Sequence, residues 1–149
     1  MNPFDIRTVV LAEHAQHVVL IHFPIALFIT AVAFDYVAQW TKNRTLSVAA
    51  YFNLLMAAIS AVPVVATGFA AWQWALEGHR LQGILLMHLV LGCTSSLLIL
   101  LVCWIHWRVR RHPVASLPGY RLPIEAVAVL LVGVTGHLGG FLTGVNSAG

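Results

Sequence analysis

The chain has 149 residues, of which 60% are hydrophobic and 9% are Asp, Glu, Lys or Arg. A soluble domain carries about a quarter of its residues as charges, so this composition excludes an ordinary soluble protein and indicates a membrane protein. The formal charge of +3 is too small and too dispersed to indicate a nucleic-acid partner. Cys93 and Cys103 fall in one apolar run without CxxC spacing and are interpreted as small packing residues.

Four apolar segments are long enough to cross a bilayer, which takes about 20 residues of helix. They span residues 18–40, 46–71, 81–107 and 122–142. The first is too long for the apolar part of a signal peptide, and no A-x-A cleavage site follows it. Short connections make successive helices run antiparallel. The sequence therefore predicts one all-α transmembrane domain over residues 1–149, an integral membrane up-down four-helix bundle.

Positive charges are distributed unequally between the two ends of this bundle. Six of the eight basic residues lie on or beside the first and third connections: Lys42, Arg44, Arg108, Arg110, Arg111 and Arg121. Arg7 and Arg80 lie on the other side. The positive-inside rule then predicts cytoplasmic connections and two periplasmic termini in a bacterial inner (cytoplasmic) membrane.

Histidines stand at the start of the first apolar segment, in "HAQHVVLIHFPIALF". A histidine in lipid needs a partner for both ring nitrogens, so their number requires a reason. His17 and His22 are five residues apart and point about 140° apart on a helix, so they cannot both ligate one iron. Pro24 follows His22 and predicts a kink that turns His22 toward the bundle axis.

Two further helices carry histidines at the same depth. His88 lies near the start of the third segment and His137 near the end of the fourth. In an up-down bundle these two and His22 lie about 7 to 12 Å below the same helix ends. Imidazole is the commonest metal ligand near neutral pH, so three imidazoles at one level indicate a common ligand.

The other histidines and two acidic residues have plainer interpretations. Three histidines lie at or beyond helix ends, where a solvated imidazole is expected: His14, His79 and His112. His106 is flanked by tryptophans and is predicted at the membrane interface. Asp35 and Glu125 lie near the cytoplasmic helix ends, where they are expected to pair with Lys42, Arg44 or Arg121. Proton uptake beside a quinone is their alternative role.

Ligation by histidines alone in a bundle core suits haem b. Zinc, copper and non-haem iron sites tend to add a carboxylate or thiolate, and the sequence has neither at this depth. The glycines of "TGHLGGFLTG" thin the last helix, as a flat macrocycle requires, although close helix packing also uses small residues. The predicted ligands are His22 and His88. His137 either replaces one of them or serves a second haem with His17.

These motifs resemble a bacterial four-helix membrane family catalogued as domain of unknown function 2231. "HVVLIHFPIALFITAVAFD" is similar to its signature HPxxVHFPIAL…FD, and "TGFAAWQWALEG…LLMHLVLG" and "TGHLGGFLTG" are similar to its later marks. The resemblance covers nearly the whole chain and departs at Val18, where the family usually has proline. His17, His22 and His88 match recurrent family histidines, and His137 matches a position that is His in some members. Fusions of members to Rieske or cytochrome c domains imply an electron-transfer setting.

Two functions are compatible with these features. The first is a non-catalytic electron-transfer subunit with one or two haems b near the periplasmic face of a larger respiratory or photosynthetic-type complex. Its partners would be other membrane subunits, a quinone, and a periplasmic cytochrome c or iron–sulfur protein. The alternative is a cofactor-free structural or assembly subunit whose histidines link helix to helix. The colour of the purified protein separates the two.

Overall fold

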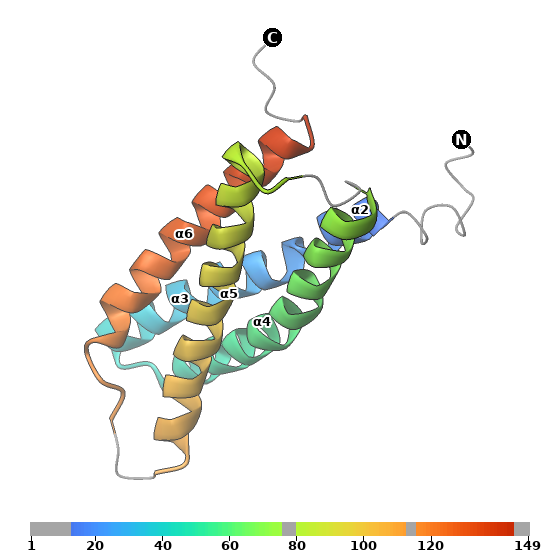
Figure 1. Ribbon diagram of the computed structural model, residues 1–149. Coiled ribbons are helices and arrows are strands. Elements are labelled where there is room, and N and C mark those ends of the chain that lie inside the picture. The colour runs from blue at the N-terminus through green and yellow to red at the C-terminus, as the bar shows by residue number, and fades with distance from the viewer. Residues whose placement is uncertain (1–12, 76–79, 113–115, 145–149) are drawn as a thin grey trace.

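The computed structural model describes residues 13–75, 80–112 and 116–144, and most of these residues are helical (Figure 1). His79 and the side chain of His14 lie outside the described part of the chain. In chain order the elements are α2 (Glu13–Leu20), α3 (His22–Thr41), α4 (Arg44–Ala70), the π-helical turn η1 (Ala71–Ala75), α5 (Gly83–Arg110) and α6 (Arg121–Leu142). The packed pairs α3–α4, α4–α5, α5–α6 and α3–α6 close a ring. The predicted all-α four-helix bundle is confirmed.

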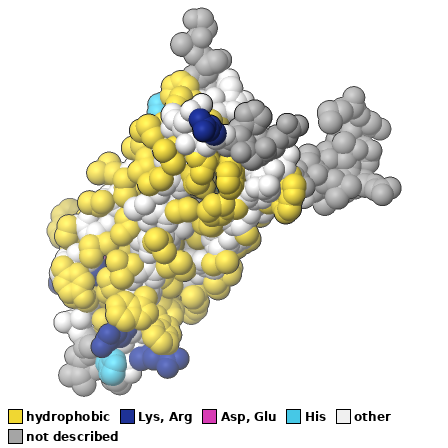
Figure 2. Space-filling model, in the orientation of Figure 1, with side chains coloured by type: hydrophobic (Ala, Val, Ile, Leu, Met, Phe, Trp, Pro, Cys, Tyr) yellow, Lys and Arg dark blue, Asp and Glu magenta, His cyan; other side chains and the backbone are white. Residues whose placement is uncertain are grey.

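Four helical stretches are long and apolar enough to cross a membrane: Gln16–Thr41, Arg44–Trp74, Gly83–Arg110 and Arg121–Leu142. Large apolar side chains point outward along them, and Leu97 and Leu130 are 66% and 70% exposed. Figure 2 shows hydrophobic side chains over most of the visible face, with Lys and Arg side chains toward its extremities. An apolar surface of this extent requires lipid as its surroundings. The chain is therefore a multi-pass membrane protein, as its sequence predicts.

The two ends of the bundle differ in charge. The basic end, as we call it, holds the α3–α4 and α5–α6 connections, and the α2 end holds α2, η1, the start of α5 and the end of α6 (Figure 1). At the basic end the Arg110 guanidinium lies 4.3 Å from the ring centre of Tyr51, and that of Arg111 lies 4.2 Å from the ring of Trp107. Arginine stacked on aromatic rings is typical of a membrane interface.

Local sequence explains the sharp reversal between α3 and α4. Lys42 has a left-handed backbone (φ 58°), which ends α3. The Asn43 side-chain oxygen then accepts hydrogen bonds from the backbone N–H groups of Thr45 (2.9 Å) and Leu46 (3.2 Å) and caps α4. An Asn cap satisfies donors that the first helical turn leaves without partners. The reversal therefore needs no longer loop, and α3 and α4 pack antiparallel.

Ile21 lies between α2 and α3, but its backbone is helical (φ −59°, ψ −28°). Its N–H donates to the His17 oxygen at 3.1 Å, and its oxygen accepts from the Ile25 N–H at 3.4 Å, so the helical hydrogen bonds continue through this position. Pro24 removes one N–H donor from the same turn. His22 is exposed at the start of α3, so its side chain is not turned to the bundle axis as expected.

The closely packed core lies between the middle of the bundle and the basic end. Small side chains dominate it, and Ala57 and Ala128 are completely buried. Alanines at such positions let neighbouring helices approach closely. On α5 the buried residues fall within 95–106, and on α6 within 121–132. Nearer the α2 end the described residues of these two helices are only partly buried or exposed.

Candidate functional site

A cavity of about 400 Å³ occupies the α2 end, where burial of α5 and α6 stops. Residues of α2, α3, α4, η1, α5 and α6 line it, and most of them are apolar. Cofactor and ligand sites commonly have volumes of roughly 300 to 1,000 Å³ and apolar walls with a few polar groups. Three histidines are among the lining residues: His17, His22 and His88. This cavity is the candidate cofactor site.

His17 on α2 is held by α4. Its Nδ1 lies 3.2 Å from the Thr67 hydroxyl oxygen. That hydroxyl also lies 2.9 Å from the Pro63 backbone oxygen and 3.0 Å from the Val64 backbone oxygen, to which it can donate its single proton. When it does so, the Nδ1–H group of His17 donates to the hydroxyl, and the lone pair of the ring is on Nε2.

His88 on α5 is held by α6 in the same way. Its Nδ1 lies 3.0 Å from the backbone oxygen of Thr135, which can only accept a hydrogen bond. The Nδ1–H group consequently donates, and the lone pair is again on Nε2. A backbone carbonyl or hydroxyl that binds Nδ1 is the usual means of orienting a metal-ligating histidine.

These two imidazoles face each other across the α2 end. Their ring centres are 6.4 Å apart and their planes are nearly perpendicular, at 88°. Each ring thus comes from one helix and is oriented by a threonine of a neighbouring helix, α4 for His17 and α6 for His88. The arrangement is repeated in the two halves of the bundle, α2 with α4 and α5 with α6.

Two glycines make room for the rings. A Cβ atom at Gly68 would lie 3.0 Å from Cε1 of His17, and one at Gly139 would lie 3.1 Å from Cε1 of His88. Real Cβ atoms rarely approach carbon so closely, so a larger residue would push either ring aside. At Gly136 a Cβ atom would meet no atom within 4 Å. The absence of a side chain therefore matters at Gly68 and Gly139, not at every glycine of "TGHLGG".

The four histidines expected from the sequence are thus separated into two groups. The structure brings His17 and His88 together rather than His22 and His88. His22 is exposed where it lines the cavity. His137 is exposed as well, is not among the lining residues, and meets Phe141 edge-on at 5.0 Å.

Sequence reasoning also missed three of the four residues beside the paired rings. Thr67, Gly68 and Thr135 carry no chemistry that would single them out, whereas Gly139 is among the glycines expected to thin the last helix. The available signal was the Thr-Gly step of "ATGFA", which contains both Thr67 and Gly68. In "VTGHLGG" the step marks Thr135, but the glycine beside His88 is Gly139, one helical turn further on.

A second group of functional side chains is buried at the basic end. The Arg121 Nε donates to Asp35 Oδ2 at 2.7 Å, and both residues are at most 2% exposed. Arg121 also donates to Gln39 Oε1 and to the Pro118 backbone oxygen, both at 3.2 Å. The predicted pairing of Asp35 with Arg121 is confirmed. The pair lies inside the bundle, because position 121 continues the inward face of α6 by one turn beyond Glu125.

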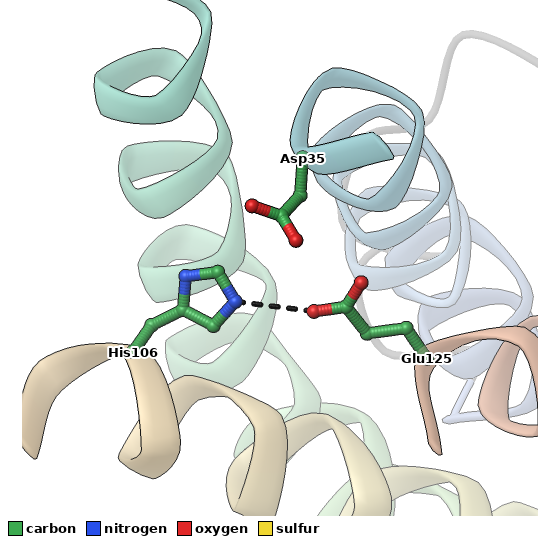
Figure 3. Close-up of side chains that lie close together, drawn as sticks. All are labelled: Asp35, His106 and Glu125. Carbon is green, nitrogen blue, oxygen red and sulfur yellow. Dashed lines mark hydrogen bonds and ion pairs between the residues drawn. The ribbon is translucent and has the colours of Figure 1, made fainter. Parts of the chain in front are cut away.

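His106 and Glu125 form the other half of this group (Figure 3). The imidazole Nε2 lies 3.1 Å from Glu125 Oε1, and the residues are 3% and 1% exposed. The prediction of an interfacial His106 is wrong, because the residue shares the inward face of α5 with Val102 and Ile99. The expectation that Glu125 pairs with Lys42, Arg44 or Arg121 is also wrong, since its partner is His106.

Fold and cavity together define a class of protein: a four-helix membrane bundle with a histidine-lined cavity of cofactor size at one end. Residues 13–147 match the family described as predicted membrane protein (DUF2231), and the chain belongs to that family. The resemblance noted in the sequence motifs is thereby confirmed. No curated protein and no solved structure matches the chain significantly.

Proposed function

We propose that this protein is a haem b-binding electron-transfer subunit of a larger membrane complex, with the haem iron held between His17 and His88. One observation carries the proposal: two imidazoles from opposite halves of the bundle face each other, and the Nδ1 of each is in a hydrogen bond with a neighbouring helix. With the ring protons on Nδ1, the Nε2 lone pairs are the ligands that the two rings offer to a metal.

The spacing of the rings fits ligation from both sides of one iron. With metal–nitrogen bonds of about 2 Å and ring centres about 1.1 Å beyond each nitrogen, two opposed imidazoles have centres about 6.2 Å apart. The rings of His17 and His88 are 6.4 Å apart. Perpendicular ring planes are compatible with this ligation, because each ring can rotate about its own metal–nitrogen bond.

The cavity suits a porphyrin more than a bare metal ion. A hydrated ion needs polar surroundings, whereas most residues that line this cavity are apolar. Gly68 and Gly139 keep the walls thin beside the two rings. Zinc and non-haem iron sites usually include a carboxylate or a thiolate. Among the described residues that line the cavity there is no Asp or Glu, and the one cysteine, Cys93, lies more than one turn deeper on α5 than His88.

Haem b with two histidine ligands supplies reversible one-electron transfer. The side chains of this chain would fix both ligands, exclude water from the iron and set the potential through Thr67 and Thr135. The partners of this protein would be other membrane subunits and a periplasmic cytochrome c or iron–sulfur protein near the α2 end, with a quinone as a further electron donor.

The spectrum of the purified protein tests this proposal. Detergent-purified protein from haem-replete cells should show the sharp reduced band of six-coordinate b-type haem, extractable into acid acetone since the chain has no CxxCH motif. His17→Gly and His88→Gly should each lose more than nine-tenths of this haem, and added imidazole should restore part of it. Restoration would distinguish a missing ligand from a misfolded protein.

His137→Gly, at an exposed histidine that does not line the cavity, is the matched control and should retain the wild-type haem content. His22→Gly changes the third lining histidine and should lose less haem than His17→Gly or His88→Gly. A colourless, folded wild-type protein would contradict the haem function and favour a structural subunit. If His22→Gly loses the haem and His17→Gly keeps it, the pairing expected from depth is right and the geometric pairing is wrong. A haem content that falls by half in His137→Gly would reveal a second haem.

The periplasmic placement of the cavity rests on the charge asymmetry and has its own test. In a variant without Cys93 and Cys103, single cysteines replace the exposed residues Ser116 at the basic end and Gln73 at the α2 end. A membrane-impermeant maleimide should label Gln73→Cys in intact cells and reach Ser116→Cys only after lysis. The reverse pattern would place the cavity at the cytoplasmic face.

A further inference from the structure

The group at the basic end contains a second set of metal-ligating side chains. Asp35, His106 and Glu125 come from α3, α5 and α6, and one ligand atom of each lies within 4.8 Å of the others. Figure 3 shows the three side chains directed toward one common space. We propose that these three residues bind one divalent first-row transition-metal ion, at a site separate from the haem cavity.

An oxygen without a partner points to a ligand at this place. Glu125 is 1% exposed, and its Oε2 has no hydrogen-bond partner in the described part of the chain. Buried carboxylate oxygens are normally bonded, because burial removes their hydration. The small void beside Asp35, His106 and Glu125 does not admit a water molecule. A directly bound cation would satisfy this oxygen where water cannot.

The distances already present are close to those around an ion. The Nε2 of His106 and Oε1 of Glu125 are 3.1 Å apart, near the roughly 3.3 Å that separates two ligand atoms in a tetrahedral site with bonds of about 2 Å. When an ion binds, the proton of this hydrogen bond would be released to solvent, and two metal–ligand bonds would replace the hydrogen bond. The ligand atom of Asp35, which lies within 4.8 Å of the other two, would then have to move closer to them.

The ligand types favour a transition metal over calcium or magnesium. One imidazole and two carboxylates suit Zn²⁺, Fe²⁺ or Mn²⁺, whereas Ca²⁺ and Mg²⁺ prefer oxygen ligands and water. Arg121, which donates to Asp35 Oδ2 at 2.7 Å, would orient that carboxylate from outside the ligand set.

This proposal does not depend on the haem function. His88 and His106 are eighteen residues apart on α5, which is about 27 Å along the helix axis. The two sites therefore lie at opposite ends of the bundle and are read out by different spectra. Loss of one signal would leave the other unchanged.

Zinc binding by the full-length protein tests the site. Chelator-treated protein in detergent, equilibrated with Zn²⁺ alone, should bind one tightly held ion per chain at this site. Glu125→Gln and His106→Gln should weaken this binding at least tenfold. His112→Gln, an exposed histidine at the same end, is the matched control and should bind zinc as the wild type does.

The zinc K-edge absorption spectrum of the wild type decides the outcome even if a variant fails to fold. One imidazole with oxygen ligands is the expected first shell. A shell with two or more imidazoles would assign the zinc to the histidines of the α2 end and overturn the proposal. Wild-type protein that binds no zinc, or variants that bind it undiminished, would overturn it as well.

Discussion

The two ends of this bundle are built from the same helices but are packed differently: one is closely packed, and the other contains a cavity. At the basic end, α3, α5 and α6 close around charged side chains that are almost fully buried, among them Asp35, Arg121 and Glu125. At the α2 end the same helices surround a cavity of about 400 Å³. One end is filled by its own side chains, and the other leaves space between two opposed imidazoles.

Side-chain size accounts for much of this difference. Between the middle of the bundle and the basic end, alanines such as Ala57 and Ala128 allow the helices to approach so closely that these side chains are completely buried. At the α2 end the small residues Gly68 and Gly139 instead face histidine rings. In Figure 1 the α5–α6 pair diverges from the α2–α4 pair toward the α2 end. Small residues therefore serve helix contact at one end and ligand space at the other.

The largest effect is expected at the basic end, from Arg121→Met. The substitution keeps an apolar chain of similar length but leaves Asp35 buried without its 2.7 Å partner. An uncompensated buried charge destabilises a protein by about 3 to 5 kcal/mol. The temperature of thermal unfolding in detergent should fall accordingly. A smaller fraction of the purified Arg121→Met protein should elute as a monodisperse peak in size-exclusion chromatography.

Two controls separate lost charge from lost packing at this site. Arg111→Met alters an exposed arginine at the same end and should change the unfolding free energy by less than about 0.5 kcal/mol. The double variant Asp35→Asn, Arg121→Met removes both charges and should recover part of the stability. Equal damage in the single and the double variant would show that packing, not the ion pair, closes the basic end.

The sequence was sufficient to predict the structure of the basic end only in outline. Long apolar segments predicted the four helices, and charge counting predicted that Asp35 meets a basic residue. His106 was misjudged because its tryptophan neighbours suggest an interface, whereas its own position on the inward face of α5 decides its burial. A helical face can be derived from spacing, but which face turns inward depends on neighbouring helices.

For the α2 end, the sequence predicted that histidines lie close together, but it did not predict which two imidazole rings face each other. Depth along the helix favoured His22 and His88, since depth is what a linear sequence encodes. The two rings that the structure places together, those of His17 and His88, depend on the lateral position of α2 against α4 and of α5 against α6. Both are properties of packing between helices, so spacing along one helix could not supply them.

The second prediction compares two glycines of the same helix turn. Gly139→Ala places a Cβ atom 3.1 Å from His88 Cε1, whereas Gly136→Ala meets no atom within 4 Å. Both substitutions raise helix propensity by roughly 0.5 to 1 kcal/mol. Overpacking against His88 should then cost Gly139→Ala about 1 to 3 kcal/mol. The haem content and the temperature of thermal unfolding should both fall in Gly139→Ala and should not fall in Gly136→Ala.

This pair of variants tests whether the α2 end is built around the position of the imidazole. If the two variants had the same haem content and the same unfolding temperature, the His88 ring could move without loss of either. The position of this imidazole would then not matter for the cavity. Gly68→Ala provides an independent repeat, because its Cβ atom would lie 3.0 Å from His17 Cε1. A cavity that holds both rings in place predicts the same loss from either side.

The smallest effect is expected from Tyr36→Phe, which removes an ordinary hydrogen bond from the basic end. The Tyr36 hydroxyl donates to the Leu122 backbone oxygen at 2.6 Å and links α3 to α6 beside the buried ion pair. A neutral hydrogen bond contributes about 0.5 to 1.5 kcal/mol, and the partial exposure of Tyr36 favours the lower part of this range. Tyr51→Phe, in which the ring under Arg110 is kept, is the matched control. If Tyr36→Phe were as damaging as Arg121→Met, contact between α3 and α6 in general, rather than the buried charges, would hold the basic end closed.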